Sequence, residues 1–474
     1  MTCNAISMIS MPAEGLVHPA ILGSILLKIL MLLSALSTRY RNTTPAVLYS
    51  GSSHGLSFPP SDGYARAHVR PQLHPKHSWS PPGFGGVALM SPDPQGNPAS
   101  PSTAIKPPKL REVRLEDYPQ IAALAAKFDL HTESYPAWTH LWTNNPACRL
   151  PQNKLPMGWV LDIGDGLIGG YLGNIPMAYE LAGQRFLAAT TRAWVVDTPY
   201  RSFSPLLLAT YFQQRNVDIF MSTTVNSLSE PAYSSFQSTR MPVGAWDRTL
   251  FWITNYRGFV ASYLRKSSRA IATPLSYPLS AGLFVRDQVM QSRFPKNSHD
   301  ISVLPCASFD DRFQTFWEKL RAVKSRVLIS DRSRDALDWH FKYALEQNLA
   351  WIYTIEGKSG VVAYAVFLRY DFPQVGLTRV RLADFQCIEP EKSLHLLTAM
   401  LATAVERCRR ESIHMFELVG VTPALEKKLE AAVPHRRVLG SWLSYYRANN
   451  PKLAQILKDS SAWEPSLFDG DSSL

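Results

Sequence analysis

The sequence has few cysteines, and none of them stand close enough together to suggest a shared site. Five occur among 474 residues, and they form neither a Cys-x-x-Cys pair nor the Cys/His spacing of a zinc site. Their odd number and wide spacing exclude a disulfide framework and give no sign of a metal. We expect a reducing, cytoplasmic setting in which each is a small buried side chain. They are Cys3, Cys148, Cys306, Cys387 and Cys408.

Charged residues are also scarce, at 18% of the chain, whereas apolar residues make up 46%. This balance excludes a wholly disordered chain, because the 12 Trp, 19 Tyr and 21 Phe side chains need a core. The net charge of +11 favours acidic partners. The Lys and Arg residues are dispersed, however, so nucleic acid is not expected as a partner, and the oligomeric state stays open.

No apolar stretch resembles an ordinary membrane span. The run at residues 20–36 is interrupted by Lys28 and is short for crossing a bilayer. Arg39 and Arg41 follow the run, whereas an export signal has its positive charges in front. Membrane association is therefore expected only through residues 20–36.

Residues 1–108 lack the apolar patterning of a packed domain. They are rich in Pro, Ser, Gly and His, so the burial of apolar side chains would not offset the entropy lost on ordering. We expect a disordered or non-native extension. Met90 offers an alternative start, in which case residues 1–89 do not belong to the native protein.

From Lys109 the pattern becomes that of an α/β domain. Turn signals at residues 164–166 and 182–184 separate three runs that we expect to form antiparallel strands. A strand-to-helix segment, a buried strand and a second helix follow. The resulting order is β-α-β-β-β-α-β-α-β, and we assign a first domain to residues 109–250.

The second half repeats this plan after a less regular connector at residues 251–300. From residue 301 two helices, three strands, a helix, a further strand and a short helix follow, which repeats the plan of the first domain. A final strand at residues 436–448 is expected to complete a second domain, residues 301–450. The predicted fold class is therefore α/β with mixed sheets, in two tandem domains.

Residues 451–474 form a C-terminal tail that we expect to dock on the folded protein. Its apolar side chains Trp463, Leu467 and Phe468 would be costly to leave in water. No chemistry is predicted for this tail.

Three segments of the first domain carry a resemblance to a known family. They are LREVRLEDYPQIAAL at residues 110–124, AWVVDTPYRSFSPLLL at 193–208 and VNSLSEPAYSSFQSTRMPVG at 225–244. In their order and pattern these segments resemble the acyl-CoA N-acyltransferase (GNAT) family. The resemblance implies two tandem GNAT-like domains, acyl-CoA such as acetyl-CoA as co-substrate, and an amine acceptor on a small molecule or peptide.

In that family the fourth strand precedes an Arg/Gln-x-x-Gly-x-Gly/Ala loop, whose N–H groups and helix dipole hold the coenzyme A pyrophosphate. Arg201 matches the first position, whereas Ser204 and Leu206 replace the glycines. Glycine permits the closest approach to phosphate, but N–H groups remain, and Ser204 adds a hydroxyl. A plain strand-to-helix connection is the alternative. The implied coenzyme A site consists of Val195, Val196, Arg201, Ser202, Phe203, Ser204, Leu206 and Asn226.

The same resemblance suggests catalytic residues. Asn226 matches a family residue near the pantetheine arm, with a helix N-terminal cap or a turn residue as the alternative. Phe236 stands where the family commonly has a tyrosine acid, so Tyr233, one turn earlier, is the substitute, with aromatic packing as the alternative. Asp197 at the end of the fourth strand is the candidate base, although such turns are structural in many of these domains.

The equivalent loop of the second domain, CIEPEKSL, carries Glu389 and Glu391 and no glycine. Carboxylates repel a pyrophosphate, so we expect this domain to serve packing or to shape the substrate groove. Asp384 lies in an otherwise apolar strand. It is predicted to be a buried carboxylate, with a hydrogen-bonded structural role favoured over catalysis.

The leading functional hypothesis is transfer of an acyl group, by preference acetyl, from coenzyme A to an amine. Proximity, polarisation of the thioester and proton transfer suffice for this reaction, without a nucleophilic side chain. One alternative is a catalytically inactive binding or scaffold protein, which the altered loop and Phe236 favour. The other is a Fem-type aminoacyltransferase, which joins two such folds but uses aminoacyl-tRNA, for which no motif is present.

Overall fold

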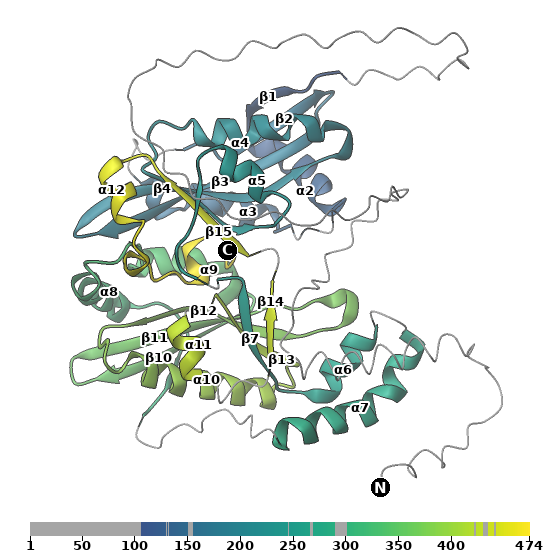
Figure 1. Ribbon diagram of the computed structural model, residues 1–474, viewed down its shortest axis with the longest axis vertical. Coiled ribbons are helices and arrows are strands. Elements are labelled where there is room, and N and C mark those ends of the chain that lie inside the picture. Colours follow the sequence, from purple (N-terminus) through teal and green to yellow (C-terminus); the bar gives the residue numbers. More distant parts are fainter. Residues whose placement is uncertain are drawn as a thin grey trace, which may run out of the picture. The chain divides into compact units, whose positions relative to one another are not determined.

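The computed structural model contains two mixed β-sheets with helices packed against them (Figure 1). The predicted α/β class with mixed sheets is confirmed. The expectations for residues 1–105, which include most of the disordered extension, the apolar run and Met90, lie outside the described residues. The structure describes residues 106–128, 130, 132–149, 155–244, 246–265, 269–289, 301–420, 423–429, 435–439 and 442–474.

The first sheet contains the meander that the turn signals predict. β2, β3 and β4 pair antiparallel in sequence, and β4 then pairs in parallel with β5. The strand order is β1-β2-β3-β4-β5-β15-β6, with β9 paired to one end of β3. The strands are β1 (Lys109–Glu112), β2 (Gly158–Gly164), β3 (Leu167–Leu181), β4 (Gln184–Val196), β5 (Ile219–Val225), β6 (Thr239–Arg240), β9 (Ile329–Ser330) and β15 (Leu443–Ala448).

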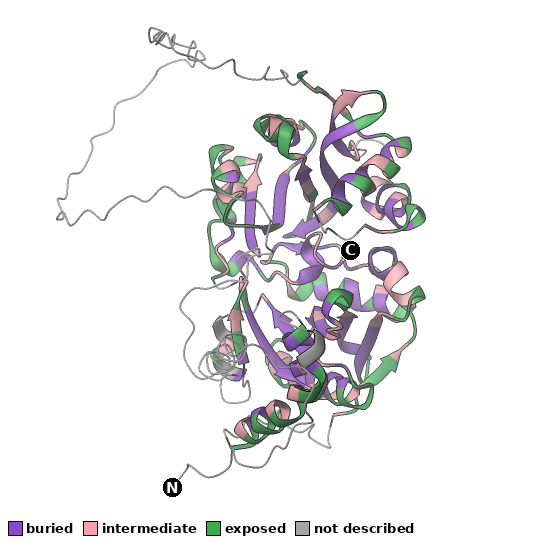
Figure 2. Cartoon of the chain, turned by 90° about the vertical axis from the view of Figure 1, so that its right-hand side faces the viewer, coloured by how far each residue is buried: buried purple, intermediate pink, exposed green. Residues whose placement is uncertain are grey.

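Helices cover both faces of the first sheet because its central strands are apolar on both sides. β3 is buried along almost its whole length, and buried residues concentrate in the strands (Figure 2). Ile121 and Trp138 pack from α2 and α3 on one face, whereas Leu207 and Tyr211 pack from α4 on the other. The helices of this half are α2 (Tyr118–Ala126), α3 (Tyr135–Thr143), α4 (Ser204–Phe212) and α5 (Glu230–Ser235).

The second sheet repeats the strand order of the first. It runs β8-β10-β11-β12-β13-β7-β14, and its parallel pair β12 and β13 corresponds to β4 and β5. α10 joins β12 to β13 as α4 joins β4 to β5. The strands are β7 (Arg248–Ile253), β8 (Leu304–Cys306), β10 (Ala350–Gly357), β11 (Gly360–Arg369), β12 (Arg379–Cys387), β13 (Met415–Val419) and β14 (His435–Val438).

The two sheets exchange a strand. β15 comes last in the chain yet pairs with β5 and β6 of the first sheet, and β7 from the first half pairs with β13 and β14 of the second. The prediction that residues 436–448 form one final strand of the second domain is therefore wrong. Apolar alternation reveals that a strand is buried, but it does not encode which strand it pairs with. Neither sheet is complete without a strand from the other half.

Residues 251–300, predicted to be irregular, contain regular structure over much of their length. Residues 251–253 belong to β7, and α6 and α7 follow. Pro274 and Pro278 lie inside α7, and proline in a sequence normally signals the end of a helix because it lacks an N–H group. The helices of this half are α6 (Tyr256–Arg265), α7 (Arg269–Val289), α8 (Asp311–Val323), α9 (Arg334–Glu346), α10 (Ser393–Arg410), α11 (Pro423–Leu429) and α12 (Pro451–Ile456).

The C-terminal tail docks as predicted. Trp463, Leu467 and Phe468 are all buried. Trp463 joins the apolar cluster of the first sheet, and Phe468 joins the cluster formed by α8, α9 and the second sheet. The tail therefore packs against both halves of the chain.

Candidate functional site

β4 and β5 run side by side over only a short length. Their ladder joins residues 188–190 to 219–221, and beyond it residues 191–196 and 222–225 do not pair with each other. We call these two segments the parted strand ends. Backbone N–H and C=O groups along such an edge are available to a ligand that carries amide groups of its own.

Tyr211 of α4 stands between the strands where they part. Its hydroxyl lies 2.6 Å from the carbonyl oxygen of Ala189, to which it donates, and accepts from the N–H of Met221 at 3.2 Å. Both residues belong to the parallel ladder, and Met221 is in its last pair, so Tyr211 contacts the strands at the point where their pairing ends. The Tyr211 side chain is fully buried, so its hydroxyl has no access to water and stays in this position.

Replacing Tyr211 with phenylalanine is expected to lower the free energy of unfolding by about 1–3 kcal/mol. The reason is that the buried groups of Ala189 and Met221 lose their partner. Urea denaturation measures the change. The control is Tyr200→Phe in the same apolar cluster, since the Tyr200 hydroxyl bonds to no residue in the described part of the chain. Equal stability of the two variants would show that the hydroxyl does not hold the strands.

Past Tyr211, polar side chains lie between the parted strand ends. Thr191 donates from Oγ1 to Ser222 Oγ at 2.7 Å, and both side chains are buried. Tyr233 of α5 is buried beside them. Burial raises the pKa of Tyr233, and hydrogen bonding with Ser222 and Thr191 offsets part of this rise. Tyr233 therefore keeps its proton at neutral pH and is able to act as a proton donor.

A bulge lies in β4 at Arg192, the residue after Thr191. The register between β3 and β4 shifts between Gly173 and Tyr171, and Ala193 adopts a φ of 50°. Bulges of this kind redirect neighbouring side chains. The Arg192 side chain is only 11% exposed and forms an ion pair with Glu133.

The C-terminal tail brings a carboxylate to the same place. Thr223 and Thr224 donate to Asp471 Oδ1 at 3.1 and 3.2 Å, and Arg192 donates to the main-chain oxygen of Asp471 at 3.2 Å. Gly470 permits this approach, because a Cβ there would lie 2.0 Å from Thr223 Oγ1. Burial raises the pKa of Asp471, which Arg192 and the threonines partly offset. The residue is still partly exposed, so it is placed to accept a proton.

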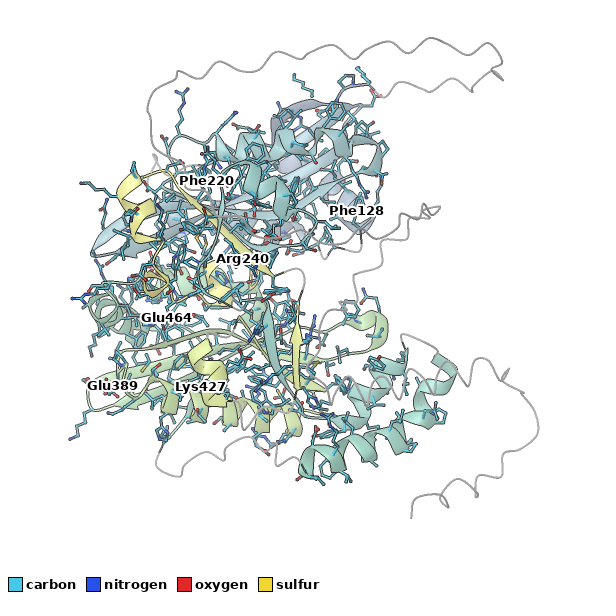
Figure 3. The ribbon with its side chains drawn as sticks, viewed as in Figure 1. Phe128, Phe220, Arg240, Glu389, Lys427 and Glu464 are labelled. Carbon is cyan, nitrogen blue, oxygen red and sulfur yellow. The ribbon has the colours of Figure 1, made fainter. Side chains whose placement is uncertain are left out.

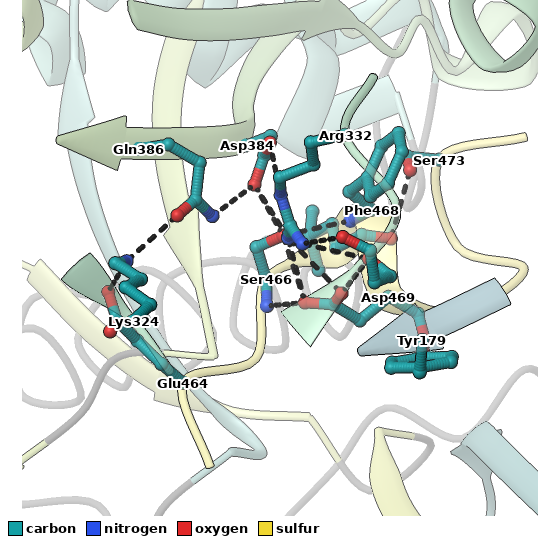
Figure 4. A network of polar contacts seen from close by, with 12 residues as sticks. Tyr179, Lys324, Arg332, Asp384, Gln386, Glu464, Ser466, Phe468, Asp469 and Ser473 are labelled. Carbon is teal, nitrogen blue, oxygen red and sulfur yellow. Dashed lines mark hydrogen bonds and ion pairs between the residues drawn. The ribbon is translucent and has the colours of Figure 1, made fainter. Parts of the chain in front are cut away.

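A buried ion network holds the tail against both sheets (Figure 4). Arg332 pairs with Asp384 at 2.9 Å and with Asp469 of the tail at 3.1 Å, and the three side chains are 1%, 0% and 6% exposed. Tyr364 donates to Asp384 at 2.6 Å, and Tyr179 of β3 donates to the Asp469 carbonyl at 2.8 Å. Burial by itself raises the pKa of Asp384, but Arg332 and the hydrogen bonds bring it below its ordinary value. The predicted burial of Asp384 is confirmed, and its ion pair and hydrogen bonds match the structural role favoured for it.

The predicted coenzyme A loop lies at the same sheet edge as the parted strand ends. Because β4 and β5 are parallel, their carboxyl ends and the start of α4 share one edge. Residues Thr198–Phe203 form a 3-10 helix rather than an open loop, and the N–H of Ser204 donates to the Arg201 carbonyl. Of the predicted residues Arg201, Ser202 and Leu206 are exposed, Val196, Phe203 and Ser204 are half-buried, and Val195 is buried.

Asp197 and Asn226 both make local structural contacts. Asp197 accepts from the N–H of Thr198 at 2.9 Å and pairs with Lys127 at 2.9 Å, and the hydrogen bond from Lys127 lowers the pKa of Asp197. A carboxylate stabilised in its charged form is a weak base. Asn226 is exposed, and its Oδ1 accepts from the N–H groups of Leu228 and Ser229 at 3.0 and 2.9 Å. These contacts match the alternative of a turn residue before α5.

The second sheet has a parted parallel pair as well. Its ladder joins residues 379–381 to 415–417 and ends there. The following strand-to-helix loop carries Glu389, labelled in Figure 3, which forms a 3.0 Å ion pair with Lys392. Beside the β12 end, Ser466 of the tail donates to Asp384 at 2.7 Å, so side chains of this chain occupy the position.

Sequence reasoning did not find Tyr211, Arg192 or Asp471. Arg192 interrupts the apolar run of β4 in the way that Asp384 interrupts β12, and that signal was available. Asp471 follows the buried pair Leu467 and Phe468 within a short polar segment, which resembles an ordinary chain end. Only the fold brings Asp471 to β5, 247 residues away in the sequence from Thr224.

The described residues define a mixed α/β protein with two sheets of the same strand order, one exchanged strand each, and a polar site at the parted strand ends. No family model matches the sequence, and no curated protein matches it. Solved structures similar to the chain include a GCN5-related N-acetyltransferase from Anabaena variabilis, with 13% identity, a TM-score of 0.43, and coverage of 72% of this chain and 73% of that one.

N-myristoyltransferase from Saccharomyces cerevisiae, solved with bound myristoyl-CoA, is also similar. It is 12% identical with a TM-score of 0.47, and 74% of this chain and 83% of that chain are covered. A GCN5-related N-acetyltransferase from Kribbella flavida is 11% identical with a TM-score of 0.43, over 72% and 70% of the two chains. At these identities the likeness concerns the course of the chain and not its side chains.

Two further features of the described residues concern metal-binding groups and membrane-spanning helices. Among the described residues, His, Cys, Asp and Glu side chains form no group of three or more that is arranged to hold a metal ion. Of the helices in the described part of the chain, none is both long enough and apolar enough to span a bilayer.

Proposed function

We propose that the protein is an acyl-CoA-dependent N-acyltransferase that works at the parted strand ends of β4 and β5. The observation that carries the proposal is the meeting there of a proton donor from α5, Tyr233, and a proton acceptor from the tail, Asp471. The resemblance of the sequence to the GNAT family supplies the reaction class. We infer a reducing, cytoplasmic setting and acetyl as the transferred group.

In this proposal the acyl-CoA lies along β4. The pantetheine arm of coenzyme A carries two amide groups, which suit the backbone groups of residues 191–196 that β5 leaves unpaired. The pyrophosphate is assigned to the start of α4, with Arg201 and Ser202 exposed there and Ser204, Leu206, Val195, Val196, Phe203 and Asn226 around it.

The proton transfers follow from the environments of the two groups. The amine nitrogen attacks the thioester carbonyl carbon, the C–N bond forms and the C–S bond breaks. Asp471, as a carboxylate, takes the proton of the amine. Tyr233, which keeps its proton because burial raises its pKa, gives that proton to the leaving sulfur. Asp197 is replaced in this scheme by Asp471, because Lys127 holds Asp197 in its charged form.

We also propose that the chain functions as two GNAT-like domains, residues 109–250 and 301–450, with the connector 251–300 between them and the tail 451–474. The repeated strand order supports this division, and the exchanged strands β7 and β15 tie the two domains together. The first domain holds the donor. The second shapes the acceptor side through the tail that both sheets bind.

Acetyl-CoA is expected to bind to the full-length protein, and Arg201→Glu is expected to weaken binding about tenfold or more, since a cation near phosphate is exchanged for an anion. Isothermal titration calorimetry measures both affinities. The matched control is Arg215→Glu, the same charge change at an exposed residue just beyond the other end of α4.

If acetyl-CoA does not bind at all, the enzyme proposal fails. If it binds equally to both variants, the pyrophosphate does not lie at the start of α4. Binding without any release of coenzyme A in the presence of amines would favour the alternative of an inactive binding or scaffold protein.

A further inference from the structure

The second sheet contains an arginine cluster that the proposed function does not explain. Glu417 of β13 is fully buried, and Arg381 of β12 donates to it at 2.7 Å. Arg437 of β14 also pairs with Glu417. Arg379 is the third member, and its nearest nitrogen lies 3.7 Å from the same carboxylate, which is beyond hydrogen-bonding distance.

The charges within this cluster do not balance, because three guanidinium groups share one carboxylate. Burial by itself raises the pKa of Glu417, but the three arginines bring it down to about 2. Burial and the repulsion of Arg381 lower the pKa of Arg379 to about 10. The side chains of Arg379 and Arg437 are 18% and 33% exposed, so a small ion in water has access to them.

Donor groups remain unused in the cluster. The Nε of Arg437 is buried and makes no hydrogen bond to any residue that the structure describes. The Nε of Arg379 donates to the carbonyl oxygen of Tyr370 at 3.2 Å. Its remaining N–H groups keep a planar fork that fits the two oxygens of a carboxylate or phosphate.

The cluster adjoins the tail that carries the proposed base. The guanidinium of Arg381 lies over the ring of Tyr370, 4.8 Å from its centre, and 5.3 Å from the centre of the Trp442 ring. The Tyr370 hydroxyl donates to the carbonyl oxygen of Ser472 at 2.5 Å. Ser472 follows Asp471 directly, so Tyr370 contacts both the arginine cluster and the residue next to the proposed base.

We propose that Arg379, Arg381 and Arg437 bind an anionic group, a carboxylate or a phosphate, on the same molecule as the amine that is acylated. This inference rests on the proposed function, and it narrows the acceptor to an amine that also bears a negative charge. Glu417 orients Arg381 and Arg437 through its ion pairs with them. Arg379 makes no hydrogen bond to Glu417, so its guanidinium group is the one that contacts the ligand most directly. One arginine is enough to neutralise Glu417 in a structural ion pair. The two additional arginines supply the positive charge that an anion site needs.

Arg379→Gln in the full-length protein tests the proposal. The probes are inorganic phosphate and, separately, acetate, at constant ionic strength, and the readout is the rise in Tm with probe concentration. At least one probe is expected to raise Tm saturably in the unmodified protein, with affinity about tenfold lower in Arg379→Gln. Arg436→Gln, the same charge change one residue before Arg437 on β14, is the matched control and keeps the full affinity.

The probe-free Tm separates ligand binding from structure. The positive charge of Arg379 is only weakly neutralised by Glu417, which the other two arginines share. Arg379→Gln is therefore expected to leave the probe-free Tm unchanged or raised, whereas a structural role for Arg379 predicts a lower Tm. Arg201→Glu should leave the anion response intact, which excludes the pyrophosphate region as its source. A stronger response to phosphate indicates a phosphorylated amine, and a stronger response to acetate an amino acid.

Two results would overturn the proposal. One is the absence of any saturable response to either probe. The other is an equal response in Arg379→Gln and Arg436→Gln. If the anion response depends on Arg379 but acetyl-CoA does not bind the protein, the anion site stands and its assignment to the acceptor of acyl transfer is overturned.

Discussion

Replacing Arg332 with methionine is expected to lower the free energy of unfolding by about 3–5 kcal/mol. Arg332 is the cation between Asp384 and Asp469, and all three side chains are almost completely shielded from water. Methionine fills much of the same volume but leaves two carboxylates buried without a counter-charge. Urea denaturation of the full-length protein measures the loss.

The matched control is Arg334→Met, two residues further along the chain. Arg334 pairs with Asp311 at the surface, where the two side chains are 48% and 90% exposed. An exposed pair of this kind contributes little, so a change within about 0.5 kcal/mol is expected. Equal stability of the two variants would mean that the buried network does not hold the tail in place.

Replacing Asp471 with asparagine is expected to reduce kcat/KM for acyl transfer by about 10²- to 10⁴-fold while leaving the affinity for acetyl-CoA unchanged. The amide keeps the shape of the side chain and its contacts with Thr223 and Thr224 but does not accept a proton from the amine. The release of coenzyme A thiol in the presence of an amine measures the rate.

The pH dependence gives a second measure of the same role. The pKa of Asp471 is raised in the folded protein, mainly by burial. Ionising it therefore weakens the folded state as pH rises from the unfolded to the folded pKa, so Asp471→Asn is expected to be at least as stable at neutral pH. Only the unmodified protein should show a rise of kcat/KM with pH through that pKa.

Glu464→Gln is the matched control in the tail. Glu464 is 50% exposed and pairs with Lys324 away from the parted strand ends. This variant is expected to keep full activity. A loss of activity as large as that of Asp471→Asn would mean that any loss of charge in the tail disturbs the site, and that Asp471 is not the base.

The two residues are linked through the tail. Arg332 anchors Asp469, and Asp471 lies two residues further along. Arg332→Met is therefore expected to weaken both stability and the placement of Asp471. Asp471→Asn affects chemistry alone, so the two variants separate the anchoring of the tail from its proposed catalytic role.

How far the sequence predicted the site differs from residue to residue. The β4-to-α4 segment was predicted because strand, polar turn and helix are local patterns, and the helix, α4, begins at Ser204. In the sequence Tyr211 is indistinguishable from the other apolar residues of that helix. Its hydroxyl has a role only in the folded protein, where β4 and β5 part. Asp197 was predicted to be a base, but its ion-pair partner Lys127 is 70 residues away in the sequence. No local pattern indicates such a partner.

The sequence by itself determined the meander of β2, β3 and β4, the strand-to-helix segments after β4 and β12, and the repeat of this plan in the two halves. It did so because apolar periodicity and turn residues act over a few neighbouring positions. Only the tertiary structure decided that β7 and β15 change sheets and that the tail brings Asp469 and Asp471 to Arg332 and Thr223. Strand pairing and buried ion pairs join residues far apart in the chain. Their energies depend on which groups meet in the folded state, and no local pattern records that.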